Sequence, residues 1–328
     1  MKAILIKSPG GPEQLTIGEW EKPRPAANEI LVKVAASAIN RADTLQRMGK
    51  YPVPPGASPI LGLEMAGTVV EIGKAVTQWK EGDTVCGLLA GGGHAEYATI
   101  HEDMAISVPQ NMSMTDAAAL PEVFLTAFQA MVWIGNLTPG EKVLIHAGGS
   151  GVGTAAIQLA KSIGATIMIT ASAGKHEMCR SLGAELTIDY HTEDFHQSVK
   201  EFTNGYGADL IIDFVAAPYF QQNLDTLALD GRLVMLALLG GTKASELNIG
   251  NILRKRLKIQ GSTLRNRDLT YKTQLTKAFQ AFAWEDIQAG RIKPVIDQVV
   301  DWTQIADAHR RMEANQNTGK IVLKISAQ

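Results

Sequence analysis

The fold of this chain is decided by the stretch Lys142-Val143-Leu144-Ile145-His146-Ala147-Gly148-Gly149-Ser150-Gly151-Val152-Gly153. It begins as an apolar run that predicts a buried β-strand, and it ends in a glycine-rich turn. A helix is expected next, because one apolar face follows at steps of three and four residues: Val152, Ala156, Leu159 and Ile163. A glycine turn between a strand and a helix is typical of a dinucleotide-binding βαβ unit.

The spacing within this turn supports that interpretation. Gly148 and Gly153 match the outer glycines of Gly-x-Gly-x-x-Gly, whereas Ser150 occupies the middle glycine position. The outer glycines permit a tight turn and a close approach of helix to strand, and free N–H groups at the helix start attract a pyrophosphate. A glycine-rich loop alone is often just a turn, but the flanking strand and helix favour a dinucleotide site. The expected binding residues are Gly148, Gly149, Ser150, Gly151, Val152 and Gly153.

Apolar strands separated by helical stretches continue this pattern. The expected strands are residues 166–170, 186–190, 209–215, 232–237 and 257–261. Such a β-α-β series implies a parallel sheet covered on both faces, so we predict an α/β fold with a doubly wound domain over residues 123–266.

The N-terminal part has a different pattern. Short strands at residues 29–39, 67–73 and 83–87, separated by Pro/Gly turns, predict a partly open β-barrel. The proline-rich loop 49–56 cannot be helical, because each proline removes a backbone donor. Past residue 265 we expect helices over 271–288 and 303–315 and strands over 294–300 and 320–325. We therefore predict a first domain of residues 1–122, completed by 267–328.

Composition limits the possible classes of protein. The 328 residues suffice for about two domains. Lys and Arg number 31 and Asp and Glu 33, a formal net charge of −2, so no basic field favours nucleic acid as a partner. The two cysteines, Cys86 and Cys179, argue against a disulfide framework. Apolar runs fall short of the ~20 residues that cross a bilayer, so we expect no membrane association and a cytoplasmic protein.

The residues after the second expected strand bear on the choice of nucleotide. An NAD enzyme usually presents an acid there for the ribose hydroxyls, but residues 171–175 contain no acid and one cation, Lys175. Lys175 would attract a 2′-phosphate and Ser172 would donate to it, so NADPH is expected over NADH. Alternatively, Lys175 is a solvated residue that opens the next helix. Tyr190 either covers the adenosine or simply packs at its strand end.

Seven motifs carry a resemblance to a known family: VAASAINRAD (34–43), GKYP (49–52), LGLEMAG (61–67), GDTV (82–85), AAALP (117–121), HAGGSGVGTAAIQLA (146–160) and MEANQNTGKIVL (312–323). Together they resemble the zinc-free quinone oxidoreductase (zeta-crystallin-like) group of the medium-chain dehydrogenase/reductase superfamily, in its stress-inducible branch above all. The resemblance implies a GroES-like catalytic domain beside a Rossmann domain.

The same resemblance indicates what this chain lacks. Zinc-dependent relatives carry a cysteine where Asn40 stands and a histidine where Leu63 stands. Without those ligands a tetrahedral zinc site cannot be built, so no metal is expected. Glu64 is then expected to serve structure by pairing with Arg41 or another cation.

The resemblance also implies site residues. Tyr51 and Asn40 would lie by the nicotinamide as catalytic residues, with Tyr51 bonding the ribose or a substrate carbonyl and stabilising developing oxyanion charge. Alternatively, Tyr51 packs its loop and Asn40 bonds within the core. The remaining expected cofactor contacts are Thr126 at the opening of a helix, which is otherwise a capping hydroxyl, Gly240 at the end of the fifth strand, Ser262, Thr263, Leu264 and Asn317. His146 is interpreted as a core hydrogen-bonding residue.

The expected activity is NADPH-dependent reduction of a quinone by hydride or electron transfer, because an electron-poor acceptor needs mainly positioning beside the nicotinamide. Two alternatives remain: a 2-alkenal or enoyl thioester reductase, and a non-catalytic NADPH-binding structural protein. As in the family, an exposed edge strand at residues 258–263 is expected to form a homodimer.

Overall fold

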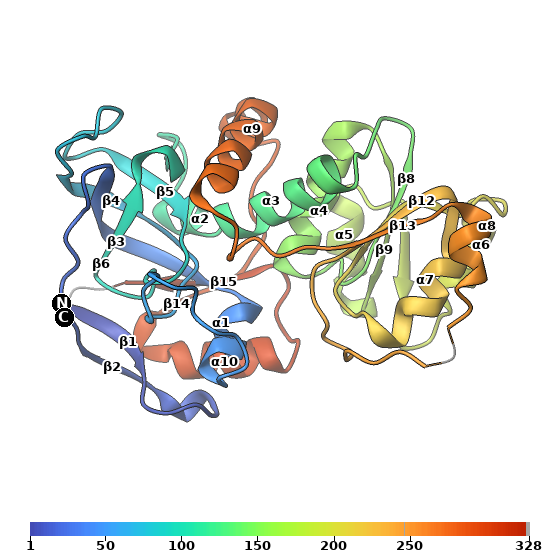
Figure 1. The fold of residues 1–328 in the computed structure, drawn as a ribbon, viewed down its shortest axis with the longest axis horizontal. Coiled ribbons are helices and arrows are strands. Elements are labelled where there is room, and N and C mark those ends of the chain that lie inside the picture. Colours follow the sequence, from blue (N-terminus) through green and yellow to red (C-terminus); the bar gives the residue numbers. More distant parts are fainter. Residues whose placement is uncertain (246, 326–328) are drawn as a thin grey trace. The chain divides into compact units, whose positions relative to one another are not determined.

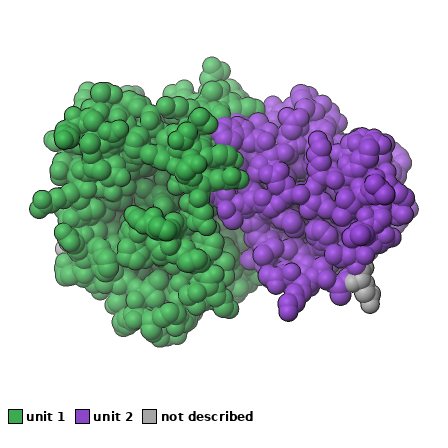
Figure 2. Space-filling model, in the orientation of Figure 1, with its two compact units in different colours: residues 1–125, 265–328 green, residues 126–264 purple. Residues whose placement is uncertain are grey.

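The computed structural model describes residues 1–245 and 247–325 and divides into two compact units. Unit 1 comprises residues 1–125 and 265–328, and unit 2 comprises residues 126–264 (Figure 2). No helix in the described ranges is both long enough and apolar enough to span a membrane.

Unit 2 contains a parallel sheet, in which Figure 1 labels β8, β9, β12 and β13. The strand order is β10-β9-β8-β11-β12-β13. The strands are β8 (Lys142–Ile145), β9 (Thr166–Ala171), β10 (Leu186–Asp189), β11 (Ala208–Asp213), β12 (Leu227–Met235) and β13 (Lys258–Gly261). The helices are α4 (Gly151–Ile163), α5 (His176–Leu182), α6 (Phe195–Phe202), α7 (Phe220–Thr226) and α8 (Gly250–Lys255). This arrangement confirms the predicted doubly wound domain.

The order of the strands determines where a ligand can bind in unit 2. From β8 the chain moves outward through β9 and β10, then returns to pair β11 with the other side of β8. This reversal makes a topological switch point at the carboxyl ends of β8 and β11, where open α/β sheets bind ligands. The glycine turn begins at this point, directly after β8. The sheet is held by fully buried apolar side chains, among them Leu144, Met168 and Ile211.

Unit 1 contains a second sheet, in the order β14-β15-β3-β4-β5-β7, with β6 also paired to β3. Its strands are β3 (Glu29–Ile39), β4 (Glu64–Ile72), β5 (Thr84–Leu88), β6 (Tyr97–His101), β7 (Ala105–Ser107), β14 (Ile296–Asp301) and β15 (Lys320–Lys324). A separate pair is formed by β1 (Lys2–Ile6) and β2 (Leu15–Glu19). The helices of unit 1 are α1 (Arg41–Arg47), α2 (Met114–Ala118), α9 (Leu269–Gln288) and α10 (Ile305–Glu313).

The long strand β3 organises unit 1. Its first half pairs with both β4 and β6, and its second half pairs antiparallel with β15 from the C-terminal segment. Ile321 and Ile39 are partners in this register, and both side chains are fully buried. The C-terminal strand therefore completes the sheet that begins at the N-terminus.

Two local expectations were wrong. Thr126 does not open a helix, because α3 (Pro121–Phe128) begins at a proline that is favourable in a first turn, and Thr126 lies inside that helix. Gly240 does not end the fifth strand, because β12 stops at Met235. Gly240 instead lies in a turn where its N–H donates to the Val215 carbonyl at 2.8 Å, and an added Cβ would lie 2.6 Å from Pro218.

Candidate functional site

The glycine turn of unit 2 is shaped by contacts that only glycine allows. A Cβ added to Gly153 would lie 2.3 Å from the Ala147 carbonyl oxygen, and one added to Gly148 would lie 2.7 Å from Cβ of Ile169. The helix start thus lies against the turn, and the turn lies against strand β9. Both outer glycines of the motif are required by packing, as expected of a dinucleotide-binding turn.

Ser150 occupies the position of the middle glycine and has a structural role there. Its backbone is extended, and its side chain caps α4 by accepting a hydrogen bond from the Gly153 N–H at 3.0 Å. The serine therefore stabilises the first turn of the helix. The other backbone N–H groups in the first turn of α4 have no carbonyl partner in the helix. They are the donors that the N-terminus of α4 offers to an anion.

Lys175 lies across this turn. A Cβ built on Gly149 would lie 2.5 Å from Cδ of Lys175, so the lysine stem runs over the second glycine. The lysine ends a short 3₁₀ segment (Ala173–Lys175) that directly precedes α5. Ser172 begins that segment and is partly exposed. The structure therefore brings the stem of the predicted cation to the glycine turn, with Ser172 three residues before it in the chain.

Tyr190 follows the neighbouring strand end. Ala171 and Asp189 are register partners in β9 and β10, so Ser172 and Tyr190 leave adjacent ends of the sheet. The Tyr190 side chain is 42% exposed, and its ring lies 4.2 Å from that of His191. The ring is therefore half-exposed, at the sheet edge where the adenosine was expected.

His146 is a structural residue, as predicted. It is fully buried, with Nδ1 3.0 Å from the Thr170 hydroxyl and Nε2 2.8 Å from the Asn223 amide oxygen. Burial lowers the pKa of the His146 imidazole, although the nearby Asp213 carboxylate opposes that shift. The ring is therefore a neutral hydrogen-bonding link between strand β9 and helix α7 of unit 2.

The segment after β13 behaves differently. The Ser262 N–H donates to the Met235 carbonyl at 2.9 Å, whereas its buried hydroxyl has no hydrogen-bond partner among the described residues. Thr263 is exposed and Leu264 is buried. Buried hydroxyls normally find a partner, so Ser262 is a candidate ligand contact.

Asn317, in unit 1, donates to the Gly319 carbonyl at 2.8 Å and so supports the turn before β15.

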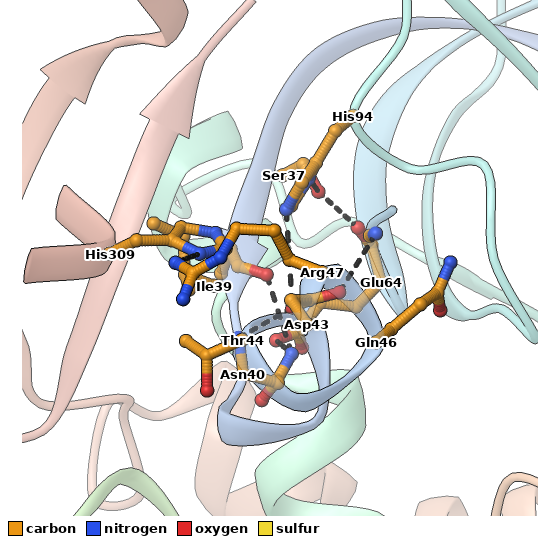
Figure 3. A network of polar contacts seen from close by, with 12 residues as sticks. Ser37, Ile39, Asn40, Asp43, Thr44, Gln46, Arg47, Glu64, His94 and His309 are labelled. Carbon is orange, nitrogen blue, oxygen red and sulfur yellow. Dashed lines mark hydrogen bonds and ion pairs between the residues drawn. The ribbon is translucent and has the colours of Figure 1, made fainter. Parts of the chain in front are cut away.

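In unit 1 the predicted residue Asn40 belongs to a buried polar network (Figure 3). Asn40 begins α1, where its N–H donates to the Asp43 carboxylate at 2.7 Å. Its side-chain amide donates to Oε1 of Glu64 at 2.9 Å and accepts from Nζ of Lys320 at 2.6 Å. Asn40 is thus a hydrogen-bonding residue of the core.

Glu64 is the centre of this network, and its partner is a cation other than Arg41, the second of the two predicted alternatives. Its Oε1 accepts from Lys320 Nζ at 2.7 Å, and its Oε2 accepts from the Glu122 N–H, at the start of α3, at 2.9 Å. Arg41 instead donates to the side chain of Asn315 at 2.6 Å. Lys320 prevails because β15 pairs directly with β3, which delivers its ammonium group to the buried carboxylate.

The residues of this region bear on metal binding. Within residues 1–245 and 247–325 no three or more His, Cys, Asp and Glu side chains form a cluster that could hold a metal ion. The cation beside Glu64 belongs to the chain itself, since Lys320 is 3% exposed and pairs with it.

Tyr51 lies in the proline-rich loop that separates α1 from β4. Burial raises the pKa of the Tyr51 phenol, and the positive charge of Arg265 opposes part of that rise. The Arg265 guanidinium carbon lies 5.3 Å from the centre of the Tyr51 ring. At neutral pH the phenol therefore keeps its proton and remains a hydrogen-bond donor.

Both units of the chain are similar to known protein families. The model of the alcohol dehydrogenase GroES-like domain matches residues 26–110, and that of the zinc-binding dehydrogenase matches residues 151–282. The human synaptic vesicle membrane protein VAT-1 homolog is 30% identical over 315 residues, which cover 92% of this chain and 80% of the relative. The chain belongs to the medium-chain dehydrogenase/reductase superfamily. The predicted fold, a GroES-like domain with a Rossmann domain, is thereby confirmed.

Other proteins similar to this chain are named for different activities. A phenolphthiocerol/phthiocerol polyketide synthase subunit of Mycobacterium tuberculosis is 32% identical over 98% of this chain, which spans 15% of that relative's length. An Escherichia coli quinone oxidoreductase solved with NADPH is 30% identical, with a TM-score of 0.89 over 99% of this chain and all of its own. The CurK enoyl reductase is 29% identical, with a TM-score of 0.86 over 99% of both chains.

The ion pair of Lys320 with Glu64 generates a stability prediction. Lys320→Met leaves the carboxylate buried without its cation, which costs about 3–5 kcal/mol in the free energy of unfolding. Urea-induced unfolding followed by circular dichroism measures this loss. The control Arg256→Met removes an exposed pair with Asp230, and its unfolding midpoint should stay near that of the unchanged protein. Equal midpoints for both variants would contradict the role given to Lys320.

Proposed function

We propose that the protein is an NADPH-dependent oxidoreductase that reduces quinones without a metal ion. The observation that carries this proposal is the placement of Lys175 across Gly149, because the stem of a cationic side chain crosses the glycine turn that leads into α4. A pyrophosphate fits the N–H donors of the turn, and a 2′-phosphate fits the lysine. The absence of an acid at residues 171–175 favours NADPH over NADH for the same reason.

The residues present fit this cofactor. The turn offers a cradle that a Cβ would fill, and Ser262 offers a buried hydroxyl without a partner among the described residues. We assign the turn residues 148–153 to the pyrophosphate, Ser172 and Lys175 to the 2′-phosphate and Tyr190 to the adenosine. The further proposed contacts, which rest on the family resemblance, are Thr126, Gly240, Ser262, Thr263, Leu264 and Asn317.

The residues proposed for the reaction have distinct roles. A reduced nicotinamide, when bound, supplies a hydride. Tyr51 keeps its proton at neutral pH and so can donate to an oxygen of the acceptor. Asn40 is held by Glu64 and Lys320, and we propose that it positions the start of α1 and the loop that follows. Asn40 and Leu63 stand where zinc-dependent relatives have a cysteine and a histidine as metal ligands. We therefore propose a reaction that uses no metal ion.

A quinone is the acceptor that such a site serves best. It is already electron-poor, so it needs orientation and a proton donor more than it needs a Lewis acid. The likeness to the NADPH-bound E. coli quinone oxidoreductase supports this choice. The likeness to the CurK enoyl reductase and to polyketide synthase subunits supports a second candidate, reduction of a 2-alkenal or an enoyl thioester at the same site.

We also propose that the protein is a homodimer paired through the edge of the unit 2 sheet. Strand β13 ends the strand order and is largely exposed, so its outer backbone groups are available to a second copy. Four apolar side chains in the segment that precedes it are exposed by half or more: Leu238, Leu239, Ile249 and Leu253. A strand edge preceded in the chain by several exposed apolar side chains favours a two-fold interface.

An acceptor screen tests the reaction. With NADPH as donor, we expect an ortho-quinone to be reduced faster than a 2-alkenal or a crotonyl thioester, as measured by the loss of NADPH absorbance. Brisk thioester reduction without quinone reduction would establish the second candidate instead. Tight NADPH binding with no acceptor reduced would indicate a non-catalytic binding protein.

The variant Lys175→Ala tests the choice of nucleotide. It should raise the dissociation constant for NADPH by about tenfold or more and leave that for NADH nearly unchanged, because only NADPH carries the phosphate. Fluorescence titration measures both constants. The matched control is Lys200→Ala, an exposed lysine of α6, which should change neither. An unaltered NADPH affinity in the Lys175 variant would remove its phosphate role.

The dimer is tested at Leu253, which is 82% exposed. Leu253→Asp puts a charge into the proposed interface and should shift the sedimentation coefficient from that of a dimer to that of a monomer. The control Phe202→Asp changes an exposed apolar residue of α6, outside residues 238–263, and it should leave the dimer intact. A monomer in the unchanged protein would refute the proposal.

A further inference from the structure

Arg265, which the sequence did not single out, is held in an unusual position in unit 1. Its side chain is 6% exposed, between β13 and α9 in the chain. Nε donates to the Ala90 carbonyl at 2.8 Å, and Nη2 donates to Oε1 of Gln46 at 2.7 Å. Nη1 is buried and has no hydrogen-bond partner in the described part of the chain.

The charge of Arg265 is also uncompensated at short range. Among residues 1–245 and 247–325 no carboxylate oxygen forms an ion pair with it within 4.0 Å. Burial lowers the pKa of its guanidinium, and the more distant Asp43 and Tyr51 oppose that shift. Burial lowers the pKa of the Lys272 ammonium, the Asp268 carboxylate opposes that shift, and the charge of Arg265 adds to it, so the two cations lie within electrostatic range of each other. An unpaired buried cation with an open donor destabilises a fold unless something binds to it.

The open donor is held rigidly. Gln46 lies on α1, and its own amide donates to the Pro59 carbonyl at 2.9 Å, which orients its oxygen toward Arg265. The guanidinium is therefore fixed by two acceptors from separate segments, and the planar geometry of arginine determines the direction of Nη1. Such a preorganised donor can stabilise charge without reorganising during a reaction.

Arg265 lies near Tyr51, the proton donor of the proposed reaction. The guanidinium carbon lies 5.3 Å from the centre of the Tyr51 ring, and the tyrosine retains its phenolic proton. The charged guanidinium therefore lies over the ring of a tyrosine that carries a neutral hydrogen-bond donor. This pair is suited to an oxygen that changes from neutral to anionic.

We propose that Nη1 of Arg265 binds the acceptor oxygen that becomes negatively charged on reduction, beside Tyr51. This inference rests on the proposed reductase function and adds a catalytic residue to it. An acceptor that takes up a hydride gains two electrons and one proton, which leaves its oxygen as an anion until a second proton arrives. Arg265 stabilises that anion, and the second proton comes from Tyr51 or from water. The substrate class is thus a quinone or a conjugated carbonyl compound whose reduced form is a phenolate or an enolate.

The test uses 4-nitrocatechol, a coloured product analogue whose absorbance distinguishes the phenol from the phenolate. No turnover or cofactor is needed. At a pH below the ionisation of the free dye, the unchanged protein should bind the dye as the anion. Arg265→Gln should weaken binding of the anion by about 10- to 100-fold and leave the bound dye protonated. Arg265→Lys keeps the charge and should retain part of the ionisation.

The matched control is Arg267→Gln. The Arg267 guanidinium lies 4.5 Å from the ring of Tyr271, so it repeats the Arg/Tyr pairing outside the proposed site. This variant should bind and ionise the dye as the unchanged protein does. Circular dichroism and the thermal midpoint verify the fold of each variant, and Arg265→Lys supplies the test if Arg265→Gln does not fold.

The outcomes separate this inference from the proposed function. Binding and ionisation of the dye that are the same in Arg265→Gln, or in Arg265→Lys, as in the unchanged protein would overturn the role of Arg265. Loss of quinone reduction in Arg265→Gln without any change in dye ionisation would also overturn it. Arg265-dependent ionisation in a protein that reduces no acceptor would uphold the anion site while the reductase proposal failed.

Discussion

The buried carboxylate of Glu64 is the constraint on which unit 1 depends. A charge with no exposure must be matched by donors, and here they come from three separate parts of the chain: Lys320 on β15, Asn40 before α1 and the N–H of Glu122 at the start of α3. The C-terminal strand is therefore joined to the N-terminal sheet by an ion pair as well as by backbone pairing. The same set of contacts orients α1, which leads into the loop of Tyr51.

The parts of this molecule that could be predicted from the sequence are those determined by local chemistry. Strand β8, the glycine turn and α4 follow one another, so apolar spacing and the glycine positions suffice to identify them. The placement of His146 in the core could be predicted for the same reason. The family resemblance added the GroES-like domain, whose strands pair over long separations and have weak local signals.

The missed features depend on distance along the chain. Lys320 and Glu64 are 256 positions apart, and Arg265 and Gln46 are 219 apart, so neither contact leaves a pattern in a short window of sequence. The expectation that Gly240 ends a strand failed on packing: the chain turns after Met235 and brings Gly240 against Pro218. A signal for Lys320 did exist, since a lysine that opens an apolar strand must find a partner when that strand is central to a sheet.

Two buried cations of unit 1 show how a structural charge differs from a functional one. Lys320 has a carboxylate, an amide oxygen and a carbonyl oxygen within 3.0 Å, so all three of its protons are used inside the fold. Arg265 is almost as deeply buried, yet it lacks a carboxylate at short range in the described chain and keeps one donor nitrogen without a partner. Folding alone would favour replacing such an arginine by an apolar residue. The presence of an arginine beside Tyr51 is explained if its missing partner is the oxygen of a bound substrate, because the anion formed there supplies the negative charge that no neighbouring carboxylate provides.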